Sequence, residues 1–189
     1  MKLASFQTTG ARPSFGVVQA DNSLIDLGCA ETPTLRAALE QWGLDGIAAR
    51  AAALKPTVKA GSFKWLPPIT NPDKILCVGL NYRQHAQEAG MAIPTYPSTF
   101  VRFADSQVGH ETPTVAPRCS DMYDFEAELA VVIGRGGRNI AEADAMNCVA
   151  GYACFAENSV RDYQRHAAQA TPGKNFESSG AFGPWLTTP

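Results

Sequence analysis

Short alternating runs of hydrophobic and polar residues open the chain. They cover residues 2–6, 15–19 and 23–27, and turn formers such as Gly10 and Pro13 separate them. Alternation of this kind between glycine, proline and asparagine breaks is typical of β-strands. The pattern therefore predicts a small β-meander at the N-terminus.

Two helices are predicted after the meander. Thr34 can cap a helix over residues 35–42, which ends at Gly43. Residues 44–54 are rich in alanine and have high helix propensity.

A proline-rich segment then divides the chain. Residues 67–73 contain three prolines, which oppose both helix and sheet hydrogen bonding. We interpret residues 1–66 as a small N-terminal α+β domain, 67–73 as a linker and 74–189 as a β-rich second domain. The second domain begins with a buried-strand pattern at 74–80 and a short helix at 81–90. Further strands are predicted at 99–103, 113–117, 125–133 and 152–155, and further helices at 141–149 and 160–168.

Composition excludes several classes of protein. The 189 residues are 45% hydrophobic, enough for a real core, and the net charge of -2 comes without a basic patch, which argues against a nucleic-acid partner. No apolar run is long enough to span a membrane, so we expect a cytoplasmic protein. The five cysteines include no Cys-x-x-Cys pair and are interpreted as small buried apolar groups.

Three acidic residues in apolar segments are the strongest candidates for chemistry. Glu126 and Glu128 stand two apart on a predicted strand, so both carboxylates point to one face, and Glu157 follows another predicted strand. Carboxylates held side by side need a cation between them or a shared proton. Oxygen ligands of this kind suit Mg²⁺ first, then Mn²⁺ or Ca²⁺. The alternative is an amphipathic strand with a solvated acidic face.

A histidine and a glutamate form a second candidate group. His85 and Glu88 stand three apart on the predicted helix, where a carboxylate can orient an imidazole that takes a proton from water. The alternative is an exposed pair without a role. His110 and His166 lack such a partner in the sequence and are interpreted as ordinary residues. Lys174 lies in a turn-rich stretch, where an exposed lysine is the default.

Taken together, six segments closely resemble the fumarylacetoacetate hydrolase family in its bacterial form. Their order and spacing match over residues 74–189, and residues 1–66 resemble the family's N-terminal domain. The segments are Val78-Gly-Leu-Asn-Tyr-Arg-Gln-His85, Asp124-Phe-Glu-Ala-Glu-Leu-Ala-Val-Val-Ile-Gly134, Ala150-Gly-Tyr-Ala-Cys-Phe155, Ser159-Val-Arg-Asp162, Gly173-Lys-Asn-Phe176 and Gly183-Pro-Trp-Leu186.

The resemblance implies an α+β fold built on a β-roll, assembled as a homodimer, with Mg²⁺ or Mn²⁺ at its active site. Carried over residue by residue, it implies Glu126, Glu128 and Glu157 as metal ligands. It implies His85 and Glu88 as the dyad, and Lys174 as the active-site lysine.

This chain departs from the family pattern in three respects. Glu157 stands where the family usually has aspartate, and Mg²⁺ tolerates little deviation from bonds of roughly 2.0 to 2.1 Å. Arg102 stands where a lysine is frequent, which predicts a change in how a substrate carboxylate is held. Family members also run on past Pro189 for a further β-rich stretch, so the resemblance implies a fragment or an unusually short member.

The combined pattern predicts a metal-dependent hydrolase that cleaves a carbon–carbon bond of an acylpyruvate-like diketo acid. In this hypothesis the metal binds the 2-oxo acid end, His85 activates water and Lys174 donates to the developing oxyanion. Decarboxylation of oxaloacetate, or isomerisation or hydration of a related oxo acid, would suit the same residues. A further alternative is a non-catalytic fragment that only binds a metal or a partner.

Overall fold

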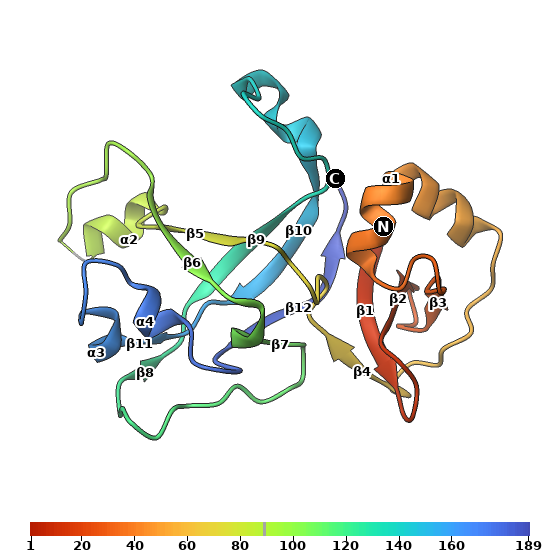
Figure 1. Cartoon of the computed structure of the whole chain (residues 1–189), viewed down its shortest axis with the longest axis horizontal. Coiled ribbons are helices and arrows are strands. Elements are labelled where there is room, and N and C mark those ends of the chain that lie inside the picture. Colours follow the sequence, from red (N-terminus) through yellow and green to blue (C-terminus); the bar gives the residue numbers. More distant parts are fainter. Residues whose placement is uncertain (89) are drawn as a thin grey trace.

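The computed structural model describes residues 1–88 and 90–189, and one mixed sheet of eight strands organises it (Figure 1). The path through the sheet is β3-β2-β1-β12-β10-β9, with β4 paired to β1 and β7 paired to β12. Its strands are β1 (Lys2–Thr8), β2 (Ser14–Val18), β3 (Leu24–Asp26), β4 (Phe63–Leu66), β7 (Gln107–Val108), β9 (Ala127–Ile133), β10 (Val149–Ala156) and β12 (Gly180–Thr187).

Two small sheets and several short helices complete the fold. The antiparallel pairs are β5 (Ile75–Gly79) with β6 (Ser98–Arg102), and β8 (Tyr123–Asp124) with β11 (Ser159–Val160). The helices are α1 (Leu35–Ala52), α2 (Arg83–Glu88), α3 (Arg161–Gln164) and α4 (Thr171–Lys174), with 3-10 turns η1 (Ala104–Ser106) and η2 (Glu142–Cys148). The mixed α+β, sheet-rich class predicted from the sequence is confirmed.

The N-terminal meander and the helix that follows it form as predicted. β1, β2 and β3 pair antiparallel in sequence order, and Thr34 Oγ1 accepts a hydrogen bond from the Ala37 amide at the start of α1. The helix then turns sharply at Gly43, where φ is 61° and ψ is -178°. Because only glycine adopts this backbone geometry readily, Gly43 separates two helical halves that both reach the core.

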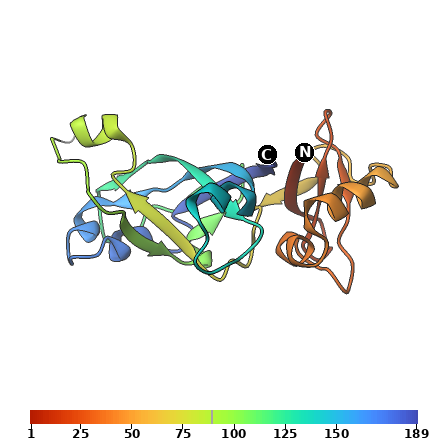
Figure 2. The same ribbon diagram turned by 90° about the horizontal axis from the view of Figure 1, so that it is seen from above.

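The N-terminal part shares its sheet and its core with the rest of the chain. β1 pairs with β12, with Lys2 opposite Thr187 and Leu3 opposite Leu186. One cluster of buried apolar side chains includes Phe15 and Ile47 as well as Phe155 and Leu186. Figure 2 shows these N-terminal elements at one end of an elongated molecule, with α2, α3 and α4 at the other. The division into domains at 67–73 stays a prediction from the sequence pattern.

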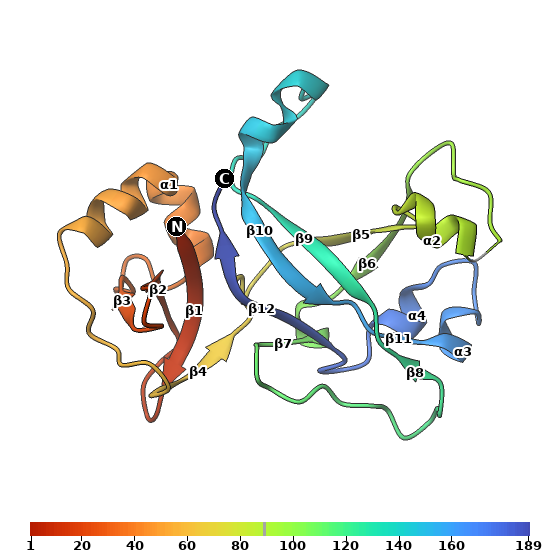
Figure 3. The same cartoon turned by 180° about the vertical axis from the view of Figure 1, so that it is seen from behind.

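The β5–β6 pair forms a second layer beside the main sheet. The opposite views of Figures 1 and 3 place β5 and β6 on one side of β9 and β10. Arg102, at the end of β6, reaches Glu157 just beyond β10, so this layer covers the end of the main sheet where the acidic residues lie.

Three predicted elements differ in the structure. Residues 113–117 form no strand, because Pro113 and Pro117 lack the amide hydrogens that a ladder needs. The helix predicted at 141–149 is the 3-10 turn η2, and the one predicted at 160–168 is reduced to the four residues of α3. None of the described helices has the length and apolar character needed to cross a membrane.

Candidate active site

Two of the three predicted metal ligands meet because β9 and β10 are antiparallel neighbours. Glu128 lies opposite Phe155, and the ladder continues past the strand ends, where the Glu157 amide donates to the Glu126 carbonyl at 2.9 Å. Side chains opposite each other on adjacent strands share a face. The carboxylates of Glu126 and Glu157 are therefore brought together from positions 31 residues apart in the chain.

Lys174 lies between these two carboxylates and is only 1% exposed. Its Nζ donates to Glu126 Oε1 at 2.8 Å and to Glu157 Oε2 at 2.5 Å. The preceding Gly173 allows α4 to approach closely, since a Cβ there would lie 2.6 Å from the Val160 carbonyl oxygen. By its turn-rich surroundings alone, Lys174 was expected to be exposed. In the structure its ammonium is buried between the two carboxylates.

Arg102 binds the Glu157 carboxylate oxygen that Lys174 does not bind. Its Nη1 donates to Glu157 Oε1 at 2.7 Å and to the Asn158 carbonyl at 3.0 Å. Its Nε donates to Ser106 Oγ at 3.2 Å, and its Nη2 to Ser179 Oγ at 3.0 Å. These contacts bind the guanidinium within the protein, and the change in how a substrate carboxylate is held, expected from arginine at this position, stays a prediction.

Glu126 is surrounded by donors that lower its pKa. Burial alone would raise the pKa of Glu126, but the hydrogen bonds from Lys174 and Ser159 and the charges of Lys174 and Arg161 outweigh it, so the pKa lies below its ordinary value. Ser159 Oγ, Arg161 Nη1 and Lys174 Nζ all bind Oε1. Within the described part of the chain Oε2 accepts no hydrogen bond, and it is the atom of this carboxylate free to meet a ligand.

Burial dominates at two neighbouring groups. It raises the pKa of Glu157 above its ordinary value in spite of the positive charges of Lys174 and Arg102. It also raises the pKa of the Cys77 thiol to about 12, with the negative charge of Glu157 adding to the rise. Cys77 and Arg102 both belong to the β5–β6 pair, so that pair provides a low-dielectric cover for Glu157.

The remaining predicted residues lie less close together. Glu128 is half-buried and lies beside Tyr82, whose pKa is raised mainly by burial. His85 and Glu88 are both exposed on α2, and Glu88 Oε1 accepts from Gln84 Nε2 at 3.0 Å. Among the described residues no hydrogen bond joins His85 to Glu88. The dyad stays a prediction from the sequence.

The donor chemistry of the cluster suits a hard divalent cation. Glu126, Glu128 and Glu157 offer only carboxylate oxygens. The ammonium of Lys174 already occupies a cation position between two of them, so a divalent ion would compete with it. Over residues 1–88 and 90–189, no three histidine, cysteine, aspartate or glutamate side chains are gathered closely enough to hold a metal ion as they stand.

Sequence reasoning missed the basic and hydroxyl residues that hold the acids. They are Arg102, Arg161 and Ser159, together with Tyr123, whose hydroxyl links Asn158 to the Ser179 carbonyl. The Ser-Val-Arg-Asp segment at 159–162 was visible as a motif but gave no role. Its partners lie more than 30 residues away, and only the fold identifies them.

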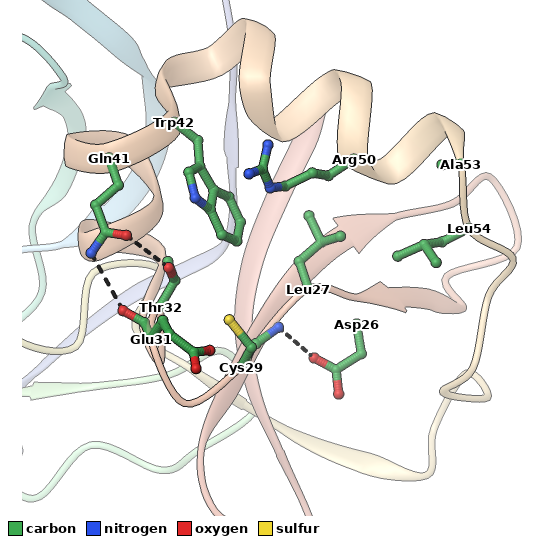
Figure 4. Close-up of a pocket in the computed structure, with 11 residues that line it drawn as sticks. Asp26, Leu27, Cys29, Glu31, Thr32, Gln41, Trp42, Arg50, Ala53 and Leu54 are labelled. Atoms are coloured by element: carbon green, nitrogen blue, oxygen red, sulfur yellow. Dashed lines mark hydrogen bonds between the residues drawn. The ribbon is translucent and has the colours of Figure 1, made fainter.

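A separate hollow of about 670 Å³ lies in the N-terminal part, between α1 and the loop that follows β3 (Figure 4). Arg50 stacks on the Trp42 ring at 4.2 Å, and Thr32 Oγ1 donates to Gln41 Oε1 at 2.9 Å. None of the predicted catalytic or metal-binding residues lines this hollow. We therefore place the candidate chemistry at the acidic cluster.

Comparison with known proteins identifies the family of the chain. The profile described as fumarylacetoacetate (FAA) hydrolase C-terminal matches residues 74–189, which is more than half of the chain. The chain belongs to the fumarylacetoacetate hydrolase family. The family resemblance and the β-rich fold predicted from the sequence are confirmed.

Two animal relatives within the family are named for the same activity. The chain is 36% identical over 198 residues to the mitochondrial oxaloacetate tautomerase fahd2 of Xenopus laevis, covering all of this chain and 62% of the relative. It is 40% identical over 164 residues to the human mitochondrial oxaloacetate tautomerase FAHD2A, covering 82% of this chain and 52% of the relative. The chain thus spans between half and two thirds of the length of these relatives.

A solved structure extends the comparison to a metal-bound member. The maleylpyruvate hydrolase of Sphingobium sp. SYK-6, in complex with manganese (II) ion and pyruvate, superposes with a TM-score of 0.76 at 26% identity. The match covers all of this chain and 67% of that one.

Proposed function

We propose that this family member is a metal-dependent enzyme that cleaves a carbon–carbon bond of an acylpyruvate-like diketo acid. The observation that carries the proposal is the buried cluster in which Lys174 bridges Glu126 and Glu157. Two carboxylates and a buried ammonium form a polar site whose charges the fold already holds in place. The pyruvate in the maleylpyruvate hydrolase structure supports a 2-oxo acid as the substrate class.

In this proposal Glu126, Glu128 and Glu157 hold Mg²⁺ or Mn²⁺. When bound, the ion supplies Lewis-acid polarisation of the substrate's 2-oxo acid group. Lys174 binds the oxygen on which negative charge develops, since its Nζ lies beside the carboxylates that face the substrate. His85, oriented by Glu88, takes a proton from the attacking water.

A second candidate function is supported by the relatives. The frog and human relatives are named as oxaloacetate tautomerases, and a tautomerase moves a proton between carbon and oxygen without an attacking water. Decarboxylation of oxaloacetate likewise needs only a held 2-oxo acid and a stabilised enolate. Decarboxylation would use the acidic cluster and Lys174 without the His85 and Glu88 dyad, whereas a tautomerase would still need a base for the carbon-bound proton, a role open to His85.

One assay separates these candidates. The full-length protein would be given acylpyruvates and oxaloacetate, with Mg²⁺, with Mn²⁺ and after chelation. We expect metal-dependent cleavage of at least one acylpyruvate. Conversion of oxaloacetate alone would favour the tautomerase or decarboxylase, and no turnover of any substrate with either metal would leave only a non-catalytic binding role.

A further inference from the structure

Arg102 is a buried cation whose guanidinium is held at several points within the protein. Four of its five N–H groups donate within the protein, and the residue is only 2% exposed. The acceptors come from three places in the fold. They are Ser106 in η1, Glu157 and Asn158 after β10, and Ser179 before β12.

The surroundings of Arg102 are shaped for a guanidinium. A Cβ at position 180 would lie 2.8 Å from Nη2, so Gly180 leaves the space that this nitrogen occupies. The guanidinium also lies over the Phe155 ring, 5.5 Å from its centroid. A lysine is a single point of charge and cannot bind Ser106, Ser179 and Glu157 at once.

These contacts of Arg102 fix the orientation of the Glu157 carboxylate. Arg102 holds Oε1 while Lys174 holds Oε2, so each carboxylate oxygen has its own cation. Glutamate has one more rotatable bond than aspartate, and without a second anchor its carboxylate could turn away from Glu126. With Oε1 fixed by Arg102, Oε2 is directed toward Lys174 and Glu126.

We propose that Arg102 is a positioning residue that fixes the Glu157 carboxylate for cation binding and thereby sets the preference between Mg²⁺ and Mn²⁺. The proposal rests on the proposed function, because it assumes that Glu157 is a ligand. It assigns Arg102 no contact with substrate. Its physical basis is that Mg²⁺ demands near-ideal octahedral geometry, so a loosened ligand should penalise Mg²⁺ more than a more tolerant ion.

The test is Arg102→Lys, which keeps the positive charge and removes the planar guanidinium with its several donors. Binding of Mn²⁺ to the full-length protein is followed by the electron paramagnetic resonance signal of free Mn²⁺, and Mg²⁺ binding by competition. Loss of a partner that orients a ligand typically weakens metal binding about 10- to 100-fold. We expect a loss of this size for Mn²⁺ and a larger one for Mg²⁺. Arg138→Lys, at an exposed position after β9, is the matched control and should change neither.

The ratio of the two affinities distinguishes positioning from general damage. A variant that is merely less stable would lose both metals in equal proportion, and that result would overturn the proposal, as would unchanged affinities. If Arg102→Lys does not fold, Ser179→Ala removes one anchor of the guanidinium and should shift the ratio in the same direction by a smaller factor. Wild-type protein that binds neither metal would instead overturn the proposed function, and the positioning role with it.

Discussion

Glu126 shows how one carboxylate can be both satisfied and available. Its Oε1 accepts from three donors, whereas Oε2 accepts from none of the residues that the structure describes. Glu126→Gln keeps the shape but removes one negative charge, so we expect affinity for divalent ions to fall at least about tenfold, or about 1.4 kcal/mol. Calorimetry would measure this, with the exposed Glu142→Gln as control. Unchanged Mg²⁺ and Mn²⁺ binding would remove the metal site as proposed.

The role of His85 separates the candidate reactions. His85 is exposed on α2 and is not proposed as a ligand, so His85→Ala should leave metal binding intact. If water attack is the chemistry, hydrolysis of acylpyruvates should be abolished, whereas decarboxylation of oxaloacetate should persist. Both rates can be followed by ultraviolet absorbance. Near-normal hydrolysis by this variant would contradict the general-base assignment.

Cys77 gives a pH-dependent test of burial at the site. Burial raises the pKa of its thiol to about 12 from the ordinary 9.0, and the thiolate is the reactive form. At pH 8 a shift of this size leaves about 1,000-fold less thiolate. We therefore expect iodoacetamide to label the exposed Cys119 and Cys154 well before Cys77, as mass spectrometry would show. Because the shift is upward, labelling of Cys77 should begin only at strongly alkaline pH or on unfolding.

At the scale of elements, α1 depends on the turn at Gly43. The two halves of the helix bury Leu35 and Leu39 on one side of the turn and Ile47 and Ala51 on the other. The backbone there is a region that side chains avoid at a cost of about 1–3 kcal/mol. Gly43→Ala should lower the free energy of unfolding by about that amount in urea titration, although the space around it is open.

Gly136→Ala is the matched control for this substitution. Gly136 also has open space around it, and its φ is not positive. The control should change stability by less than about 0.5 kcal/mol. Equal stability of the Gly43 and Gly136 variants would mean that the turn can relax without strain.

At the scale of the whole molecule, β9 is an edge strand with an apolar outer face. Leu129, Val131 and Ile133 alternate along it and are 59%, 48% and 59% exposed. Exposed apolar edges of this kind favour association. The longer relatives contain residues outside the matched part, which covers 62% and 67% of two of them. We propose that a second copy of the chain, as in the homodimer that the family resemblance implies, covers this face in the working enzyme.

We therefore expect the 189-residue polypeptide to associate in solution. Light scattering and sedimentation would measure the association. Val131→Lys, on the outer face of β9, should reduce it without lowering the free energy of unfolding by more than about 0.5 kcal/mol. A monodisperse, fully active monomer of residues 1–189 would show that the open face needs no partner.

Local patterns in the sequence determined most of the elements. Short alternating or apolar runs between turn-forming residues predicted β1, β2, β5, β6 and β10 within a few residues, because such runs report buried faces directly. Thr34 and Gly43 marked α1 because capping and unusual φ values are properties of single residues. The strand predicted at 113–117 was wrong because the prediction relied on the apolar pattern and ignored the missing amide hydrogens of Pro113 and Pro117.

The candidate site, too, could be predicted only in part from the sequence. The sequence by itself indicated Glu126, Glu128 and Glu157 as candidates, since side chains two apart on a predicted strand are expected to share a face. The family motifs pointed to Lys174. Only the tertiary structure showed that Lys174 is buried between Glu126 and Glu157 and that Arg102 holds Glu157 from behind. These contacts join β6, β10 and α4, and β1 joins β12 across nearly the whole chain. Pairings at such separation depend on how buried surfaces fit together, which no local pattern of residues encodes.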